Sequence, residues 1–247
     1  MTHGKVAFIT GGGSGIGAAA AGAFVARGYA TVIVDMDEDG GRAVEEELGA
    51  IGECRFLRCD VTDDENVKAT IQDAVARYGR LDAAFNAAGI DGEHGKLTAE
   101  GSTENWNRVL AVDLSGLWSC MRYEIPELLK TGGGVIVNCA SVAGLRAAPT
   151  VSAYTAAKHG VVGLTKVAAR EYASRGVRVN AVCPGSVDTP MFRRSMPPEF
   201  IERVIANIPA GRLAEADEIA SVVLWLCDDA PGFLTGQMIA IDGGTSA

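Results

Sequence analysis

The chain has 247 residues, 48% of them hydrophobic, and a formal net charge of −9. This hydrophobic content supports a packed core and excludes a mainly disordered chain, while the negative charge argues against nucleic acid or an anionic membrane as the main partner. The length alone fits one large domain or two small ones.

Cysteine and histidine positions argue against a metal site. The six cysteines form no C-x-x-C pair and lie mostly in apolar segments, which predicts reduced thiols rather than disulfides. The three histidines are scattered, at positions 3, 94 and 159, and we expect surface or packing roles for them. No signal peptide is evident, and no apolar run reaches the ~18–20 residues of a membrane span. We therefore expect a cytoplasmic protein without a membrane partner.

A glycine-rich turn joins the first predicted strand, 5–9, to an alanine-rich helix that ends near Arg27. Its spacing is G-x-x-x-G-x-G, which differs from G-x-G-x-x-G, and it lacks the Gly-Lys-Ser/Thr of a P-loop. Such a turn either serves packing alone or, with the helix N-terminus, holds a pyrophosphate. Its place in a strand–turn–helix unit favours the nucleotide, with contacts predicted from Gly11, Ser14, Gly15, Ile16 and Gly17.

The second predicted strand, 31–34, is followed by Asp35, which comes 18 residues after Gly17. An acidic residue at about this spacing is placed to accept a hydrogen bond from the adenosine ribose 2′-OH. A 2′-phosphate would instead meet a like charge, costing about 4 kcal/mol at 4 Å with an effective dielectric near 20. The alternative is an exposed turn aspartate, since Asp37, Glu38 and Asp39 follow. We favour NAD over NADP.

The next unit contains a further predicted cofactor contact. Residues 38–48 have the pattern of an acidic amphipathic helix, and 54–58 that of a third strand. Asp60 and Val61 follow at the sheet edge, where Asp60 is placed to touch adenine. Thr62 and Glu65 have the spacing of a capping box, which predicts that Thr62 caps a helix running to about Tyr78.

A fourth strand is predicted at 83–85 and ends at Asn86, before a polar loop that reaches about Ser102. A long helix is then predicted over about 103–130. Asp113 lies inside a mostly apolar stretch of this helix, which is unusual unless the carboxyl group has a partner.

The strand predicted at 134–138 leads to the strongest chemical pattern. Ser141 comes just past the end of that strand, at the edge where open α/β sheets bind ligands. Tyr154 and Lys158 are spaced to stand one turn apart on a following helix. A lysine cation within about 4–6 Å favours the phenolate of a tyrosine, and Ser141 is placed to hydrogen-bond the oxygen that exchanges the proton. The alternative is an ordinary helical pair with a capping serine.

The remaining segments complete a strand–helix alternation. A strand at 178–182 is followed by Pro184-Gly185, a helix at 218–227 and a last strand at 238–241. Residues 186–212 hold four of the eight prolines and mix apolar side chains with arginines, which predicts a mobile flap over the site. We predict an α/β Rossmann fold: a doubly wound parallel sheet flanked by helices, in one domain over 1–247.

With these residues placed, the chain resembles the classical short-chain dehydrogenase/reductases along essentially its full length. The glycine turn matches their T-G-x-x-x-G-I-G, and Ser141, Tyr154 and Lys158 match their catalytic residues in type and spacing. Pro184, Val187 and Thr189 match their loop around the nicotinamide, and Asp242-Gly243-Gly244 matches a common ending. The resemblance implies hydride transfer between a nicotinamide cofactor and an alcohol or ketone.

The resemblance also implies individual roles. Tyr154 would be the general acid in reduction and the general base in oxidation, and Ser141 would position the substrate oxygen. Lys158 would lower the Tyr154 pKa and bind the nicotinamide ribose, while Thr189 would hold the carboxamide. A homotetramer is implied as well, with the helix at 103–130 and the Tyr154 helix packing against symmetry mates.

The chain departs from the family pattern at two positions. The family's N-N-A-G is Asn86-Ala87-Ala88-Gly89 here, so one amide that usually ties loop to sheet is missing, and we expect a small loss of hydrogen bonding. The family's catalytic asparagine is replaced by Asp113. We expect Asp113 to keep the relay role, either protonated or joined to Lys158 through a water, with an altered pH optimum.

Three functions remain open. The first is an NAD-dependent dehydrogenase of a hydrophobic or cyclic secondary alcohol and its ketone. The second is an NADP-dependent 3-ketoacyl-thioester reductase, against which Asp35 argues. The third is a catalytically silent nucleotide-binding regulatory protein, for which Asp113 is the supporting feature. The expected pocket is largely apolar and formed by Val142, Leu145, Ala147, Thr150, Met191, Phe192 and Met196.

Overall fold

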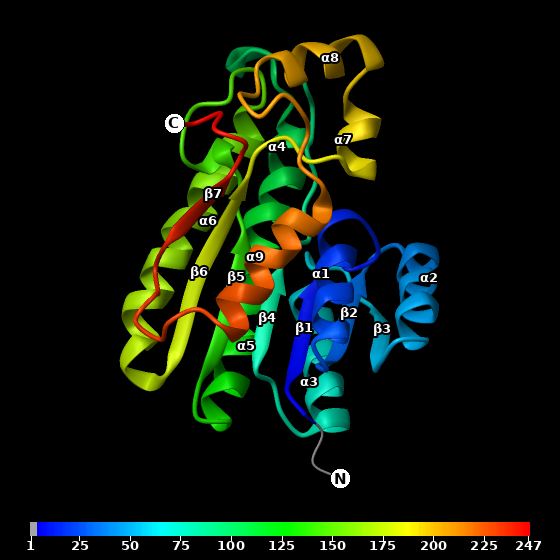
Figure 1. Cartoon of the computed structure of the whole chain (residues 1–247). Coiled ribbons are helices and arrows are strands. Elements are labelled where there is room, and N and C mark those ends of the chain that lie inside the picture. Colours follow the sequence, from blue (N-terminus) through cyan, green and yellow to red (C-terminus); the bar gives the residue numbers. More distant parts are fainter. Residues whose placement is uncertain (1–3) are drawn as a thin grey trace.

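Seven parallel strands form one sheet in the order β3-β2-β1-β4-β5-β6-β7 (Figure 1). The computed structural model describes residues 4–247, so His3, for which we predicted a surface or packing role, lies outside the described residues. The strands are β1 (Val6–Thr10), β2 (Ala30–Asp35), β3 (Cys54–Arg58), β4 (Ala83–Asn86), β5 (Gly134–Cys139), β6 (Val177–Pro184) and β7 (Met238–Ile241). The doubly wound parallel sheet of the prediction is confirmed.

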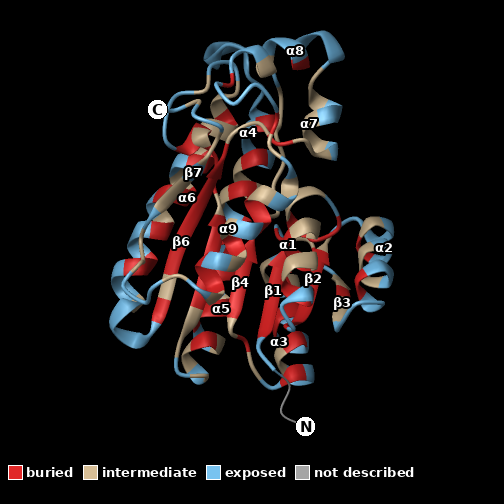
Figure 2. Ribbon diagram, in the orientation of Figure 1, coloured by how far each residue is buried: buried red, intermediate tan, exposed pale blue. Residues whose placement is uncertain are grey.

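Helices cover both faces of this sheet. On one face, the sheet forms a hydrophobic core with α1 (Gly15–Ala26) and α9 (Ala216–Asp228). On the other face, it forms a second core with α3 (Asp64–Tyr78), α5 (Leu117–Lys130) and α6 (Ser152–Tyr172). Helix α2 (Glu38–Gly49) packs on the edge strand β3. The central strands are almost wholly buried, while the helices expose their outer faces (Figure 2). Burial on both sides explains why these strands are continuous apolar runs in the sequence.

The order of strands reverses between β1 and β4, and this reversal places the candidate site. Thr10 is in register with Val34 on one side and with Asn86 on the other, so the loops after β1 and β4 diverge from the same point. Crevices of this kind, at the carboxyl ends of the strands, are where open α/β sheets bind ligands. Helices α7 (Pro190–Ser195) and α8 (Pro198–Ala206) lie beyond these ends, opposite the N-terminal end of the described chain (Figure 1).

Two local predictions need correction. The helix predicted over 103–130 is divided into α4 (Thr103–Leu110), a π-helical segment (Ala111–Gly116) and α5. Thr62 does not cap α3, because Asp63 does so by accepting hydrogen bonds from the Glu65 and Asn66 amides, both at 3.1 Å. Thr62 instead donates to Asp60.

The segment 186–212, which we predict from sequence to be a mobile flap, contains two helices. It folds into α7 and α8, which share a small apolar cluster centred on Ile201, Ile208 and Leu213. Within residues 4–247, no helix is long and apolar enough to cross a membrane.

Candidate active site

Ser141, Tyr154 and Lys158 come together just beyond the end of β5. Ser141 caps the short turn Val142–Gly144 by accepting a hydrogen bond from the Ala143 amide at 3.1 Å, which leaves its own proton free to donate. Tyr154 and Lys158 lie on α6, and the Lys158 Nζ atom is 5.4 Å from the centroid of the Tyr154 ring. Ser141 is therefore a capping residue, and Tyr154 and Lys158 are a helical pair, as the structural alternative predicts. The three side chains nevertheless lie in one cluster.

Asp113 is in direct contact with Lys158. Its Oδ2 atom lies 3.1 Å from Lys158 Nζ, and its Oδ1 atom accepts a hydrogen bond from the Ile90 amide at 2.8 Å. Lys158 Nζ also donates to the Cys139 carbonyl oxygen at 3.1 Å. The expected water bridge between Asp113 and Lys158 is thus wrong, because these two atoms already touch.

Burial and charge act against each other in this cluster. Burial raises the pKa of Asp113, and Lys158 offsets part of that rise. Burial opposes the charge of Lys158, but Asp113 and Tyr154 hold the pKa of the lysine above its ordinary value. Burial also raises the pKa of Tyr154, Lys158 lowers it, Asp113 raises it and hydrogen bonding by Ser141 lowers it. Lys158 therefore acts on Tyr154 as predicted, but the pKa of Tyr154 stays above its ordinary value.

The π-helical segment explains how a carboxyl group reaches this position. π-Helical turns are rare and often mark functional sites, because the wider turn changes which side chains face inward. Asp113 lies within the segment and is completely buried. Gly89 packs directly above the ion pair: a Cβ atom there would lie 3.2 Å from Asp113 Oδ2 and 3.4 Å from Lys158 Nζ. The glycine thus keeps the loop after β4 close to the catalytic cluster.

The glycine turn after β1 forms a cradle that fits a pyrophosphate. Gly11 has φ +67°, and a Cβ atom on Gly17 would lie 2.1 Å from the Gly11 carbonyl oxygen, so both positions require glycine. Ser14 is the N-cap of α1, yet its side chain makes no capping hydrogen bond and is exposed. The first turn of α1 carries no acidic residue. The helix N-terminus therefore keeps amide and hydroxyl donors for an anion.

The loop after β4 stays tied to the sheet despite its missing amide. The Ala87 and Ala88 amides both donate to the Thr10 hydroxyl oxygen at 3.0 Å. The Asn86 side chain is fully buried and bonds Glu124 and Asn138, so only its backbone remains for a cofactor.

Asp35 and Asp60 lie at the carboxyl ends of β2 and β3. Asp35 is oriented by the Gly13 and Asp37 amides, each 3.0 Å from one of its carboxylate oxygens. Asp60 accepts from the Thr62 amide at 2.9 Å, which fixes the turn before α3. The Val61 side chain packs into the core, and a Cβ atom on Gly116 would lie 2.8 Å from it. Asp35 and Asp60, but not the Val61 side chain, are therefore available to contact an adenosine.

The loop after β6 lies next to the glycine turn. A Cβ atom on Gly15 would lie 3.3 Å from the Thr189 methyl group, so these two predicted cofactor contacts are neighbours. Thr189 caps α7 by accepting from the Phe192 amide at 3.2 Å. Pro184 ends β6, and the Val187 side chain is buried with a backbone bridge to Ala214. Ile16 packs against the core below the turn.

The predicted substrate residues separate into two groups. Val142 is half-buried and Leu145 is exposed, both within four residues of Ser141. Phe192 and Met196 instead pack into the apolar cluster of α7 and α8, and Met191 is half-buried on α7. Arg193 forms a two-point ion pair with Asp188, with both contacts at 2.6 Å. This arginine is therefore paired with a carboxylate just before its own helix.

This geometry agrees with the comparisons to known proteins. The chain matches the family model described as Enoyl-(Acyl carrier protein) reductase over residues 11–246. It is 42% identical over 247 residues to a 2,5-dichloro-2,5-cyclohexadiene-1,4-diol dehydrogenase of Sphingobium indicum, covering 99% of this chain and 98% of the relative. It is also 42% identical over 241 residues to a cyclohexanol dehydrogenase of Acinetobacter sp., covering 97% and 94%. The chain belongs to the short-chain dehydrogenase/reductase family.

Solved structures of the same family superpose closely. Levodione reductase gives a TM-score of 0.94 at 36% identity, covering 97% of this chain and 96% of the other. A 3-ketoacyl-(acyl-carrier-protein) reductase from Brucella melitensis, complexed with NADH, gives 0.93 at 32% identity and covers 100% of both chains. As a member of this family the chain is an oxidoreductase that acts on CH–OH groups.

One buried group behind the site of this dehydrogenase was not predicted from sequence. Glu124 on α5 is fully buried, and its Oε2 atom accepts from Asn86 Nδ2 at 3.0 Å. Asn86 also donates to Asn138 at 3.1 Å, and Asn138 donates to Thr165 at 3.0 Å. The sequence does contain a signal for the burial of Glu124. Glu124 lies three residues after Met121 and four before Leu128, which are both buried, so helical spacing places it on the buried face.

Proposed function

We propose that this protein is an NAD-dependent dehydrogenase of cyclic secondary alcohols, working also in reverse on the ketones. The observation that carries the proposal is the cluster of Ser141, Tyr154 and Lys158 at the edge of the sheet beside a cradle suited to a pyrophosphate. Cyclic alcohols and diketones are named for the relatives and the solved structure reported above. The apolar residues Val142 and Leu145, which follow Ser141 closely, agree with such a substrate.

In this proposal each residue of the cluster has its own role in the reaction. A bound nicotinamide supplies or accepts the hydride. In oxidation, the Tyr154 oxygen takes the proton of the alcohol, whose oxygen Ser141 orients by donating its O–H. Lys158 keeps its positive charge close to the Tyr154 ring and so favours the phenolate. Asp113 and the Cys139 carbonyl hold the lysine in place.

NAD rather than NADP is supported by Asp35. Its carboxylate is fixed at the end of β2, beside the glycine turn, by the Gly13 and Asp37 amides. A ribose hydroxyl can donate to this carboxylate, whereas a 2′-phosphate would meet its negative charge.

The test is a side-by-side measurement of NADH and NADPH oxidation with cyclohexanone, a linear ketone and a ketoacyl thioester. We expect turnover with NADH and the cyclic ketone, and little with NADPH. Tyr154→Phe should reduce kcat by roughly 10²–10⁴ or more while NADH binding persists. Turnover mainly with NADPH and the thioester would instead support the ketoacyl reductase. NADH binding without turnover of any substrate would support the silent nucleotide-binding protein.

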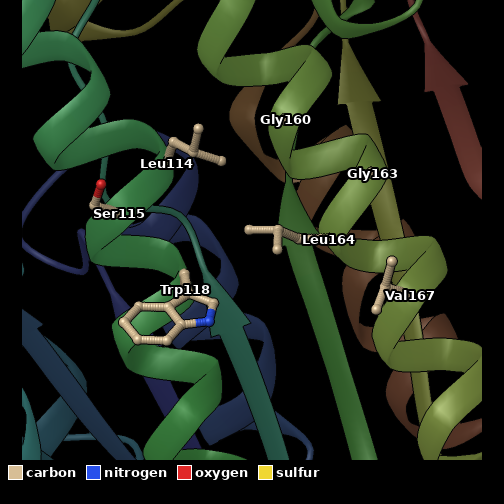
Figure 3. A pocket seen from close by; sticks show the side chains of 7 residues that line it. All are labelled: Leu114, Ser115, Trp118, Gly160, Gly163, Leu164 and Val167. Atoms are coloured by element: carbon tan, nitrogen blue, oxygen red, sulfur yellow. The ribbon is translucent and has the colours of Figure 1, made fainter.

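We further propose a homotetramer in the cytoplasm. Leu114, Ser115 and Trp118 face Gly160, Leu164 and Val167 of α6 across a groove on the outer surface (Figure 3). Trp118 is 48% exposed and Val167 53% exposed, so this face presents apolar side chains outward. Two such faces from neighbouring subunits would bury these side chains, in agreement with the assembly that the family resemblance implies.

A further inference from the structure

The segment between β4 and α4 carries a histidine–carboxylate pair next to the catalytic cluster. His94 Nε2 lies 3.3 Å from Asp91 Oδ2, and the two side chains are 33% and 29% exposed. The pair therefore faces solvent in part and keeps polar atoms available to a ligand. The catalytic roles described above use neither residue.

Neighbouring contacts place Asp91 beside the site. Ile90 packs in the same apolar cluster as Tyr154, and its amide donates to Asp113 Oδ1 at 2.8 Å. Asp91 follows directly, and its negative charge raises the pKa of Asp113. Asp91 is thus within electrostatic reach of the group that holds Lys158.

The segment is fixed on both sides of Asp91. The Ile90 amide is bound to Asp113 on one side, and on the other the Glu93 amide donates to Asn105 Oδ1 at 2.9 Å. The Glu93 carboxylate in turn accepts from the Ser102 hydroxyl at 2.8 Å. The backbone on both sides of Asp91 is therefore fixed, so less ordering of this segment is left to occur when a ligand binds.

One oxygen of Asp91 is left without a partner. His94 contacts Oδ2, and among residues 4–247 no side chain or backbone group donates a hydrogen bond to Oδ1. An ionised carboxylate accepts hydrogen bonds and cannot donate them, so its natural ligand is a hydroxyl group. A substrate carboxylate would instead meet the negative charge of Asp91.

We infer that Asp91, oriented by His94, binds a second hydroxyl group on the ring of the substrate, away from the carbon that is oxidised. The inference rests on the proposed function and narrows it to neutral cyclic diols and hydroxyketones. Asp91 is then a specificity residue and His94 a positioning residue for it.

The experiment compares kcat/KM for trans-cyclohexane-1,4-diol and for cyclohexanol with NAD. The wild-type enzyme should prefer the diol, and Asp91→Ala should reduce the diol-to-cyclohexanol ratio by ~10–100-fold, the value of a hydrogen bond to a charged group. Asp91→Asn keeps an acceptor oxygen without the charge and should fall in between. His94→Gln should lower the ratio in the same direction. Glu104→Gln, an exposed carboxyl change on neighbouring α4, should leave the ratio unchanged.

The outcomes separate the two proposals. Turnover of cyclohexanol by the wild-type enzyme with no preference for the diol would overturn the role of Asp91 and leave the proposed function standing. The same holds if Asp91→Ala reduces both substrates equally, or if 4-hydroxycyclohexanecarboxylate is used better than the diol. No turnover of any cyclic alcohol would overturn the proposed function and this inference with it.

Discussion

The Asp113 carboxyl group acts electrostatically on both Lys158 and Tyr154, to which we assign the catalytic roles. It contacts Lys158 at 3.1 Å and raises the pKa of Tyr154. Asparagine at this position is uncharged, so Asp113→Asn should lower the pKa of Tyr154. Because alcohol oxidation needs the phenolate as base, the rising limb of the kcat/KM–pH profile should move to lower pH. Steady-state oxidation measured between pH 6 and 10 checks this.

A matched control for Asp113→Asn is available on α3. Asp73 is an exposed carboxylate in a surface ion pair with Arg55, away from the catalytic cluster, and Asp73→Asn should leave the profile where it is. An unchanged profile for Asp113→Asn would show that the carboxyl group does not act on Tyr154.

Thr150 adopts a strained backbone conformation in the loop between Ser141 and α6. Among residues 4–247 it is the only non-glycine residue with a positive φ, at 69°. Such strain costs roughly 1–3 kcal/mol, while the added chain freedom of glycine costs about 0.5–1 kcal/mol. Thr150→Gly should therefore raise the free energy of unfolding by about 1 kcal/mol. Ala147→Gly in the same loop should lower it, and thermal melts of both variants at equal concentration compare the two.

That Ser141, Tyr154 and Lys158 lie together could be predicted from sequence, because their arrangement is local. Tyr154 and Lys158 are one helical turn apart, and a strand end fixes Ser141 beside them. The direct contact between Asp113 and Lys158 could not, because it depends on the π-helical turn, which shifts Asp113 relative to a regular helix. The pKa of Tyr154 also depends on burial, which no sequence spacing gives.

Among the elements, α5, β4 and β5 are joined by a buried polar chain that makes stability depend on pH. Burial raises the pKa of Glu124 to about 8, against an ordinary value of 4.5, and Asn86 lowers it in part. The nearby Cys120 thiol is also buried, and its pKa is raised. Asn86 and Asn138, which face Glu124 from the strands, are neutral.

The direction in which stability changes with pH follows from the raised pKa of Glu124. The folded protein keeps this proton between pH 4.5 and about 8, whereas the unfolded chain loses it. Stability from this group therefore falls with rising pH in that window, at about 1.4 kcal/mol per pH unit, and is level above it. Glu124→Gln keeps a neutral group of the same shape and should remove this slope. Its advantage over the wild type should grow from pH 5 to pH 8.

Melting temperatures from pH 5 to pH 9 measure this effect. Glu47→Gln on exposed α2 serves as the control and should follow the wild-type curve. Parallel curves for Glu124→Gln and the wild type would mean that Glu124 is ionised in the folded protein over this range.

Element boundaries were predictable where the hydrophobic pattern ends sharply. β3 and β7 have the predicted bounds, and for β7 the polar residues Gln237 and Asp242 stop the apolar run at both ends. The start of α3 was missed, because Asp63 caps the helix where the capping-box spacing favoured Thr62. The high proline content of 186–212 does not predict its two helices, but Pro190 and Pro198 each begin a helix, a position that proline favours.

At the scale of the whole molecule, strand–helix alternation was enough to predict the parallel sheet, but it left open how subunits assemble. In the proposed tetramer, the exposed apolar side chains on α5 and α6 would form one contact face (Figure 3). Trp225 on α9 and Phe233 before β7 are also exposed and lie on other elements, where a second contact would form. Two different faces are what a tetramer with dihedral symmetry needs.

A charge on the first face should break the assembly. Wild-type protein at micromolar concentration should sediment near four times the chain mass of 25.6 kDa. Val167 is 53% exposed in the single chain, so Val167→Glu should leave the fold intact and shift the protein to dimers or monomers, because a glutamate would have to be buried unpaired. Ile51→Glu makes the same change at a 64% exposed position outside the groove and should not alter the size. A wild-type monomer, or a Val167→Glu protein of unchanged size, would show that this groove is not a contact between subunits.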